Sequence, residues 1–193
     1  MSDVTPAAAL HHYLQEAREA LVWKLDGLSE SQVRSPMTPT GTNLLGLVKH
    51  TATVESGYLG ATFGRPFPEP TPWAEPDAEP NADMFATAEE SIDDIVDFYR
   101  RVWVHSDATL TELPLDTQGE VPWWRPEKRK VTLHRIAVHV IAETHRHAGH
   151  ADIVRETIDG ASGLRADNSS KPDDLDWAAY RDRLDAIARS FDA

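Results

Sequence analysis

Helix-like spacing of apolar residues is the feature that most limits what this chain can fold into. Five segments place apolar side chains three and four residues apart, which is the repeat of an amphipathic α-helix. No run of alternating apolar and polar residues bounded by hairpin turns competes with them. The pattern predicts an all-α fold, an up-and-down four-helix bundle with an additional C-terminal helix. The expected helices span about residues 6–28, 43–63, 84–113, 131–158 and 172–191.

The stretch between the second and third expected helices is too rich in proline to be helical. Six prolines lie between Pro66 and Pro80, so we expect an extended connection over the surface. Between Arg65 and Arg100 there are ten acidic residues and no basic one. We interpret them as a solvated acidic face, because no EF-hand loop pattern accompanies them. A length of 193 residues predicts a single domain over residues 1–193.

The charge balance narrows the range of partners. With 32 acidic and 19 basic residues the net charge is -13, so neither nucleic acid nor an anionic membrane surface is expected to bind. A secretion signal and a membrane span of about eighteen apolar residues are both missing, which predicts a cytoplasmic protein. Because the chain has no cysteine, any thiol chemistry needs a thiol from a second molecule.

The segment HVIAETHRHAGH, residues 139–150, carries four histidines and one glutamate. At about 100° per residue, one sector of about 80° on the helix contains His139, Glu143, His147 and His150. His134 and His145 point to the opposite side. The sector also carries apolar residues, and a polar group on a core-facing stripe needs a partner. That partner is either a metal ion or, for Glu143 and His147, a hydrogen bond within the pair. The alternative to both is that these residues simply form a solvated face.

A lone histidine on the second expected helix adds a candidate third ligand. His50 shares the apolar face of its helix with Leu47 and Val54, where it can meet Glu143 and His147 across a bundle. A core histidine of this kind is more often structural than a ligand. A third group on a facing helix is nonetheless what an open, three-ligand metal site requires. The residues alone leave both interpretations open.

Two longer segments resemble a known family. The stretches NLLGLVKHTATVESGYLG, residues 43–60, and VTLHRIAVHVIAETHRHAGHADIVRETIDG, residues 131–160, are similar to the paired motifs of the DinB-like superfamily. The branch they resemble includes mycothiol-dependent S-transferases and maleylpyruvate isomerases, and the similarity covers nearly the whole chain. The resemblance implies a DinB-like four-helix bundle that binds a divalent metal through one residue of the second helix and two of the fourth.

The resemblance also implies roles for individual residues. The implied metal ligands are His50, Glu143 and His147, with Glu143 at a position where most relatives have histidine. His150 stands where many relatives have glutamine, and it can replace a ligand, complete the coordination or act as an acid or base. We take it as the candidate catalytic residue, and His139 as a packing or hydrogen-bonding residue. Zinc suits this donor set, as do nickel, iron and manganese.

The activity implied by the resemblance is a metal-dependent thiol S-transferase. A low-molecular-weight thiol such as mycothiol would attack a small electrophilic substrate. A metal-dependent hydrolase needs the same ligands, and a non-enzymatic bundle that binds a structural metal or a small ligand is a further alternative.

Two features outside the histidine-rich helix bear on partners. The basic segment WWRPEKRK, residues 123–130, either guides an anionic cosubstrate or is a solvated charge cluster. The aromatic residues Trp73, Trp123 and Trp124 fit a homodimer interface, and equally the mouth of a pocket.

Overall fold

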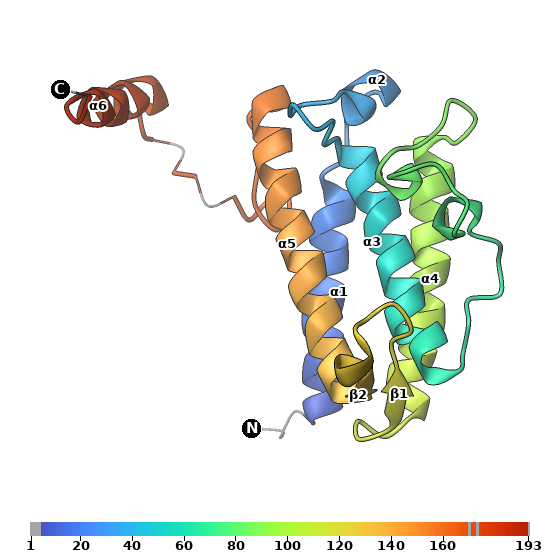
Figure 1. The fold of residues 1–193 in the computed structure, drawn as a ribbon. Helices are drawn as coiled ribbons and strands as arrows, with labels where there is room; N and C mark the ends of the chain where they lie inside the picture. Colours follow the sequence, from blue (N-terminus) through green and yellow to red (C-terminus); the bar gives the residue numbers. More distant parts are fainter. Residues whose placement is uncertain (1–4, 170, 173, 193) are drawn as a thin grey trace.

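The computed structural model describes residues 5–169, 171–172 and 174–192, and four long helices dominate it. They lie side by side (Figure 1) and are α1 (Pro6–Trp23), α3 (Leu44–Leu59), α4 (Ile92–Glu112) and α5 (Leu133–Asp159). The shorter elements are α2 (Glu30–Arg34), α6 (Trp177–Arg189) and the 3-10 turns η1 (Ala61–Phe63), η2 (Pro72–Ala74), η3 (Ala82–Met84) and η4 (Pro126–Lys128). The predicted all-α class is confirmed.

The interior is built from the apolar faces of the four long helices. α1 packs against α5 and α4, and α3 packs against α4 and α5. Fully buried leucines and isoleucines from these helices include Leu14, Leu21, Leu45, Leu47, Ile95, Leu133 and Ile136. Their burial is the favourable term that holds the helices together. Within the described residues, no helix combines the length and the apolarity needed to cross a membrane.

An ion pair lies inside this apolar interior. The Nε atom of Arg18 on α1 donates to Oε2 of Glu55 on α3 at 3.1 Å, and both side chains are fully buried. The Nη1 atom of Arg18 donates to Oδ1 of Asp107 on α4 at 2.8 Å. One guanidinium group therefore joins three helices. This pair could not be predicted from the sequence, because charged residues are expected on the outside of a helix unless their partner is known.

Four predicted helix ends need correction, and one of them is the start of α6, which begins at Trp177 rather than near residue 172. α1 ends at Trp23 rather than near residue 28, and a turn with Gly27 at φ 76° follows. α3 ends at Leu59, and η1 continues to residue 63 as a separate turn. α4 begins at Ile92 rather than near residue 84, because Ser91 and Asp94 form a capping box in which each side chain accepts from the other's backbone N–H.

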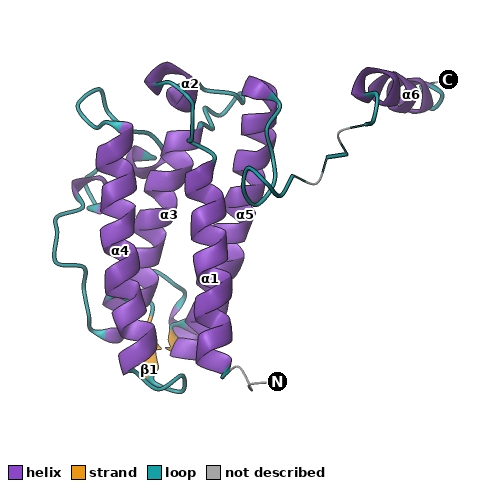
Figure 2. Ribbon diagram, turned by 180° about the vertical axis from the view of Figure 1, so that it is seen from behind, coloured by secondary structure: helices purple, strands orange, loops and turns teal. Residues whose placement is uncertain are grey.

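A small antiparallel sheet, which the sequence analysis did not predict, precedes α5. Strand β1 (Gln118–Glu120) pairs with β2 (Lys130–Thr132), with Gly119 opposite Val131. Strands of three residues are too short to show an alternating pattern. The hairpin lies at the end of the molecule where α5 begins (Figures 1 and 2).

The proline-rich connection between α3 and α4 follows the surface, as predicted, and is attached to α3 by side-chain contacts. The Nε1 atom of Trp73 donates to Oγ1 of Thr53 at 2.8 Å. Nearer the start of α3, Nδ2 of Asn43 donates to the carbonyl oxygen of Met84 at 3.2 Å. These two bonds hold the connection against α3 along much of the helix.

Two further contacts bring the end of this connection close to α3. The buried Nζ atom of Lys49 donates to both carboxyl oxygens of Glu90, at 2.9 and 2.8 Å. At Gly46 the backbones approach so closely that a Cβ atom would lie 1.8 Å from the carbonyl oxygen of Met84. Residues 81–84 therefore have a fixed position beside the first turns of α3.

The C-terminal helix α6 stands apart from the four long helices in both views (Figures 1 and 2). None of its described residues is buried, and Leu184 and Ile187 are 46% and 53% exposed.

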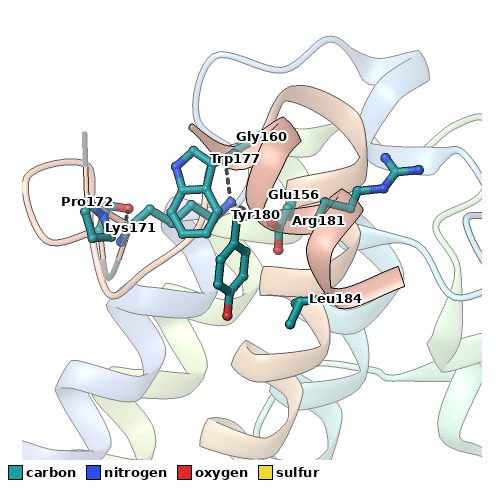
Figure 3. A pocket seen from close by; sticks show the side chains of 9 residues that line it. Glu156, Gly160, Lys171, Pro172, Trp177, Tyr180, Arg181 and Leu184 are labelled. Atoms are coloured by element: carbon teal, nitrogen blue, oxygen red, sulfur yellow. Dashed lines mark hydrogen bonds and ion pairs between the residues drawn. The ribbon is translucent and has the colours of Figure 1, made fainter. Parts of the chain in front are cut away.

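A hollow of about 760 Å³ lies between the end of α5 and α6 (Figure 3). Its lining residues are Glu156, Gly160, Ser169, Lys171, Pro172, Trp177, Tyr180, Arg181 and Leu184. Within this hollow, the Nζ atom of Lys171 lies 2.8 Å from Oε1 of Glu156. This hollow contains none of the predicted site residues.

Candidate functional site

α3 and α5 bring His50 and His147 together. The two imidazole rings meet edge to face, with their centroids 4.8 Å apart. His147 is buried at 7% exposure, and His50 is partly exposed. The meeting of these two histidines across facing helices is what their positions on apolar helix faces predicted.

Glu143 lies one turn before His147 on α5 but is not hydrogen-bonded to it. The distance between Oε2 of Glu143 and Nε2 of His147 is 3.6 Å, beyond hydrogen-bond length. Burial, and then the neighbouring imidazoles of His50 and His150, lower the pKa of His147 to about 4. His147 is therefore neutral at pH 7 and cannot form an ion pair with Glu143. The hydrogen-bonded pair considered from the sequence is not what holds these two side chains.

The other ring nitrogen of His147 also lacks a partner. Its Nδ1 atom is buried and has no hydrogen-bond partner among the described residues. Polar atoms without a partner are rare in protein interiors, because each costs about 1–3 kcal/mol. The buried Nδ1 atom is therefore a cost that no contact among the described residues offsets, whereas Nε2 is the ring nitrogen that lies toward Glu143.

His50 has a partner that the sequence analysis missed. Nδ1 of His50 lies 2.6 Å from Oδ2 of Asp83 in η3. A carboxylate only accepts, so the Nδ1–H of His50 donates, and the Nε2 atom of the neutral ring keeps its lone pair. A carboxylate behind a histidine is the usual arrangement around histidine ligands of metals. No local pattern pointed to Asp83, which is 33 residues from His50 and one of ten acids in its region.

His150 and Arg146 surround the same cluster on its exposed side. The ring of His150 is exposed and lies 5.4 Å from that of His147, measured between centroids. The Nη1 atom of Arg146 is 3.6 Å from Oε2 of Glu143. His150 therefore stands beside the candidate ligands, where solvent and a substrate can reach it.

The remaining histidines of α5 have other surroundings. His139 packs edge to face on Tyr58 and Trp124, with ring centroids 4.7 and 5.3 Å away. This agrees with its predicted packing role. His134 is exposed and His145 is partly exposed.

The donor types of the cluster fit a divalent metal, although the side chains do not form a complete site. In the part of the chain that the structure describes, no three histidine, aspartate or glutamate side chains converge closely enough to hold a metal ion. The cluster nevertheless offers two imidazoles and one carboxyl group, a donor set that zinc and other divalent ions accept. The assignment of His50, Glu143 and His147 as metal ligands stays a prediction.

Comparison with known proteins identifies the family. No curated protein matches the chain. The sequence model of the family described as Mycothiol-S-transferase matches residues 9–160, a span that contains α3, α4, α5 and the whole histidine and glutamate cluster and that leaves out α6. Because this match covers most of the chain, the protein belongs to the Mycothiol-S-transferase family, a branch of the DinB-like superfamily.

Proposed function

We propose that this protein is a metal-dependent transferase that joins the thiol of mycothiol to a small electrophilic molecule. The observation that carries the proposal is the pairing of His50 with His147 beside Glu143, in a chain of the Mycothiol-S-transferase family. The family's name implies mycothiol as the thiol substrate. The missing cysteine is compatible with this, because the nucleophile then comes from the cosubstrate.

The proposed ligands are His50, Glu143 and His147, with zinc as the metal. When bound, the metal supplies a Lewis acid that lowers the pKa of the mycothiol thiol. Asp83 accepts the Nδ1–H of His50 and so keeps the Nε2 atom of that ring available as a donor. The neutral state of buried His147 likewise leaves it able to donate a lone pair at pH 7.

His150 is the proposed proton acceptor. When the sulfur of mycothiol forms its bond to the electrophilic atom, the thiol proton passes to His150. The electron pair displaced from the electrophile leaves with a departing group or stays as a carbanion that is then protonated. The exposed position of His150 next to His147 allows it to release the proton to solvent.

The scaffold that we propose for this site is the DinB-like up-and-down bundle. Its four helices would be α1, α3, α4 and α5, with ligands on the facing helices α3 and α5. Small helical bundles often place metal ligands on facing helices in this way.

The test measures metal content and thiol consumption in the same preparation. Protein purified without a histidine tag is analysed for metals and then incubated with mycothiol and a panel of electrophiles, including an aryl chloride and a maleyl compound. We expect one metal per chain and a thioether product whose formation stops when the metal is chelated. Bound metal without thiol consumption would exclude the transferase and favour a hydrolase or a structural metal.

Two histidine variants locate the metal. His50→Ala removes a proposed ligand from the partly exposed edge of α3, so the variant should fold and lose most of its metal. His145→Ala is the matched control on α5, outside the cluster, and should keep its metal. Equal metal content in both variants would exclude His50 as a ligand.

A further inference from the structure

The loop between β1 and β2 forms a second site-like feature at the start of α5. A surface hollow of about 400 Å³ is lined by Trp123, Trp124, Arg125, Lys128 and Arg135. We refer to it as the tryptophan pocket. It combines a flat aromatic surface with three cationic side chains, in a chain whose net charge is -13.

The aromatic wall of the tryptophan pocket is held in place by hydrogen bonds. The hydroxyl oxygen of Tyr58 accepts from Nε1 of Trp124 at 2.8 Å and from Nε1 of Trp123 at 3.3 Å. The Nε atom of Arg129 donates to the carbonyl oxygen of Trp124 at 2.9 Å. Because both indole N–H groups are engaged behind the wall, the exposed surface of Trp123 presents its ring to solvent, at 54% exposure.

The cations of the pocket are available to a ligand. Among the described residues, Arg129 lies 3.9 Å from Glu120, whereas no ion pair is found for Arg125, Lys128 or Arg135. Glu127 lies within the same loop and is exposed, and no ion pair is found between it and these described groups. The guanidinium of Arg135 is stacked over Trp124, 5.1 Å from the ring centroid. Three unpaired cations around an indole wall favour an anion that has a flat apolar part.

The tryptophan pocket adjoins the histidine and glutamate cluster. His139 contacts both Tyr58 and Trp124, and it precedes Glu143 by one turn of α5. Arg135 precedes Glu143 by two turns, which is a distance of about 12 Å along the helix axis. The tryptophan pocket and the cluster therefore follow one another along α5, with His139 between them.

We propose that the tryptophan pocket binds the acid group of a flat organic anion, with Arg125, Lys128 and Arg135 around the charge and Trp123 against the apolar part. In the transferase this anion is the electrophilic substrate, so the pocket selects electrophiles that carry a carboxylate or another acid group. The identity of this anion as the electrophilic substrate rests on the proposed function, whereas anion binding in the tryptophan pocket does not.

The test compares two probes that differ only in charge, 2-naphthoate and its neutral amide. Their affinities are measured by isothermal titration on the full chain treated with a chelator. We expect naphthoate to bind at least about tenfold more tightly than the amide and to weaken as salt is added, because the charge supplies the selectivity. The signal of the Trp124 indole N–H, assigned with Trp124→Phe, should shift on titration with naphthoate. Equal affinities of acid and amide would overturn the proposal.

Three variants test whether naphthoate binds in the tryptophan pocket and whether its binding is independent of the proposed metal site. Arg135→Gln should weaken naphthoate binding at least about fivefold, because one of the three cations is lost. Arg100→Gln, on the exposed surface of α4, is the matched control and should not change it. His50→Ala should bind naphthoate like the unaltered protein, whether or not the metal prediction holds. Unchanged affinity in Arg135→Gln, or loss of binding in His50→Ala, would overturn the proposal.

Discussion

The carboxyl group of Asp83 is the contact that most affects how His50 can act. It reaches the Nδ1 side of the ring from a separate segment of chain, and so decides which ring nitrogen carries the proton. It also limits rotation of a side chain that is otherwise partly exposed. The orientation of His50 therefore depends on a residue outside both helices of the cluster.

Replacing Asp83 should weaken metal binding without removing a ligand. We expect a loss of metal affinity of about 10- to 100-fold in Asp83→Ala, and a smaller one in Asp83→Asn, whose amide oxygen still accepts a hydrogen bond. Competition with a zinc-binding dye measures both affinities. Glu79→Gln, in the same acidic connection and exposed, is the control. Wild-type affinity in Asp83→Ala would contradict this role.

At the scale of elements, the position of Asp83 depends on how closely the connection packs on α3. That approach is possible only because Gly46 has no side chain: a Cβ atom there would overlap the carbonyl group of Met84. Asn43, which caps α3 by accepting from the N–H of Gly46 at 2.7 Å, donates to the same carbonyl oxygen. One turn of helix thus fixes both the start of α3 and residues 81–84.

Two glycine variants distinguish the effect of close packing on the free energy of unfolding from the effect of helix propensity. Gly46→Ala should lower the free energy of unfolding by about 1–3 kcal/mol, because the added methyl group pushes the two segments apart. Gly149→Ala, on α5 with open space around it, should raise that free energy by up to about 1 kcal/mol, since alanine favours helix. Urea unfolding of the chelated proteins measures both. Changes of the same sign in the two variants would contradict this account.

The elements also show what the sequence could and could not predict. The long amphipathic helices and the meeting of His50 with His147 followed from apolar spacing, because that pattern is repeated over several turns. Apolar spacing did not predict the three-residue strands of the hairpin, the late start of α4 or the role of Asp83. Each of these depends on tertiary contacts or on a few residues. The Arg18–Glu55 pair could not be predicted from the sequence for the same reason.

At the scale of the whole molecule, α6 differs from the rest of the chain. It lies outside the residues matched by the family and buries none of its described side chains. Its described ties to the body near its start are the contacts of Lys171 with Glu156 and with the carbonyl oxygen of Gly160. The single domain over residues 1–193 therefore stays a prediction.

Shortening the chain tests that prediction. A chain ending at Lys171 should unfold with a free energy within about 0.5 kcal/mol of the full chain, because exposed residues contribute little to stability. Calorimetry and urea unfolding measure the difference, with Arg18→Ala as a reference for a change inside the core, expected to cost about 3–5 kcal/mol. A loss of several kcal/mol in the shortened chain would instead support one domain that includes α6.

The division of the proposed ligands between α3 and α5 has a consequence for the order of assembly. The proposed ligands Glu143 and His147 are neighbours on one helix, so on this proposal they would bind a metal only weakly when that helix alone has formed. His50 joins them only after α3 has docked, and Asp83 only after the acidic connection has settled on α3. Tight metal binding would therefore be the last step of folding. The bound ion would stabilise the contact between the two helices and slow their separation.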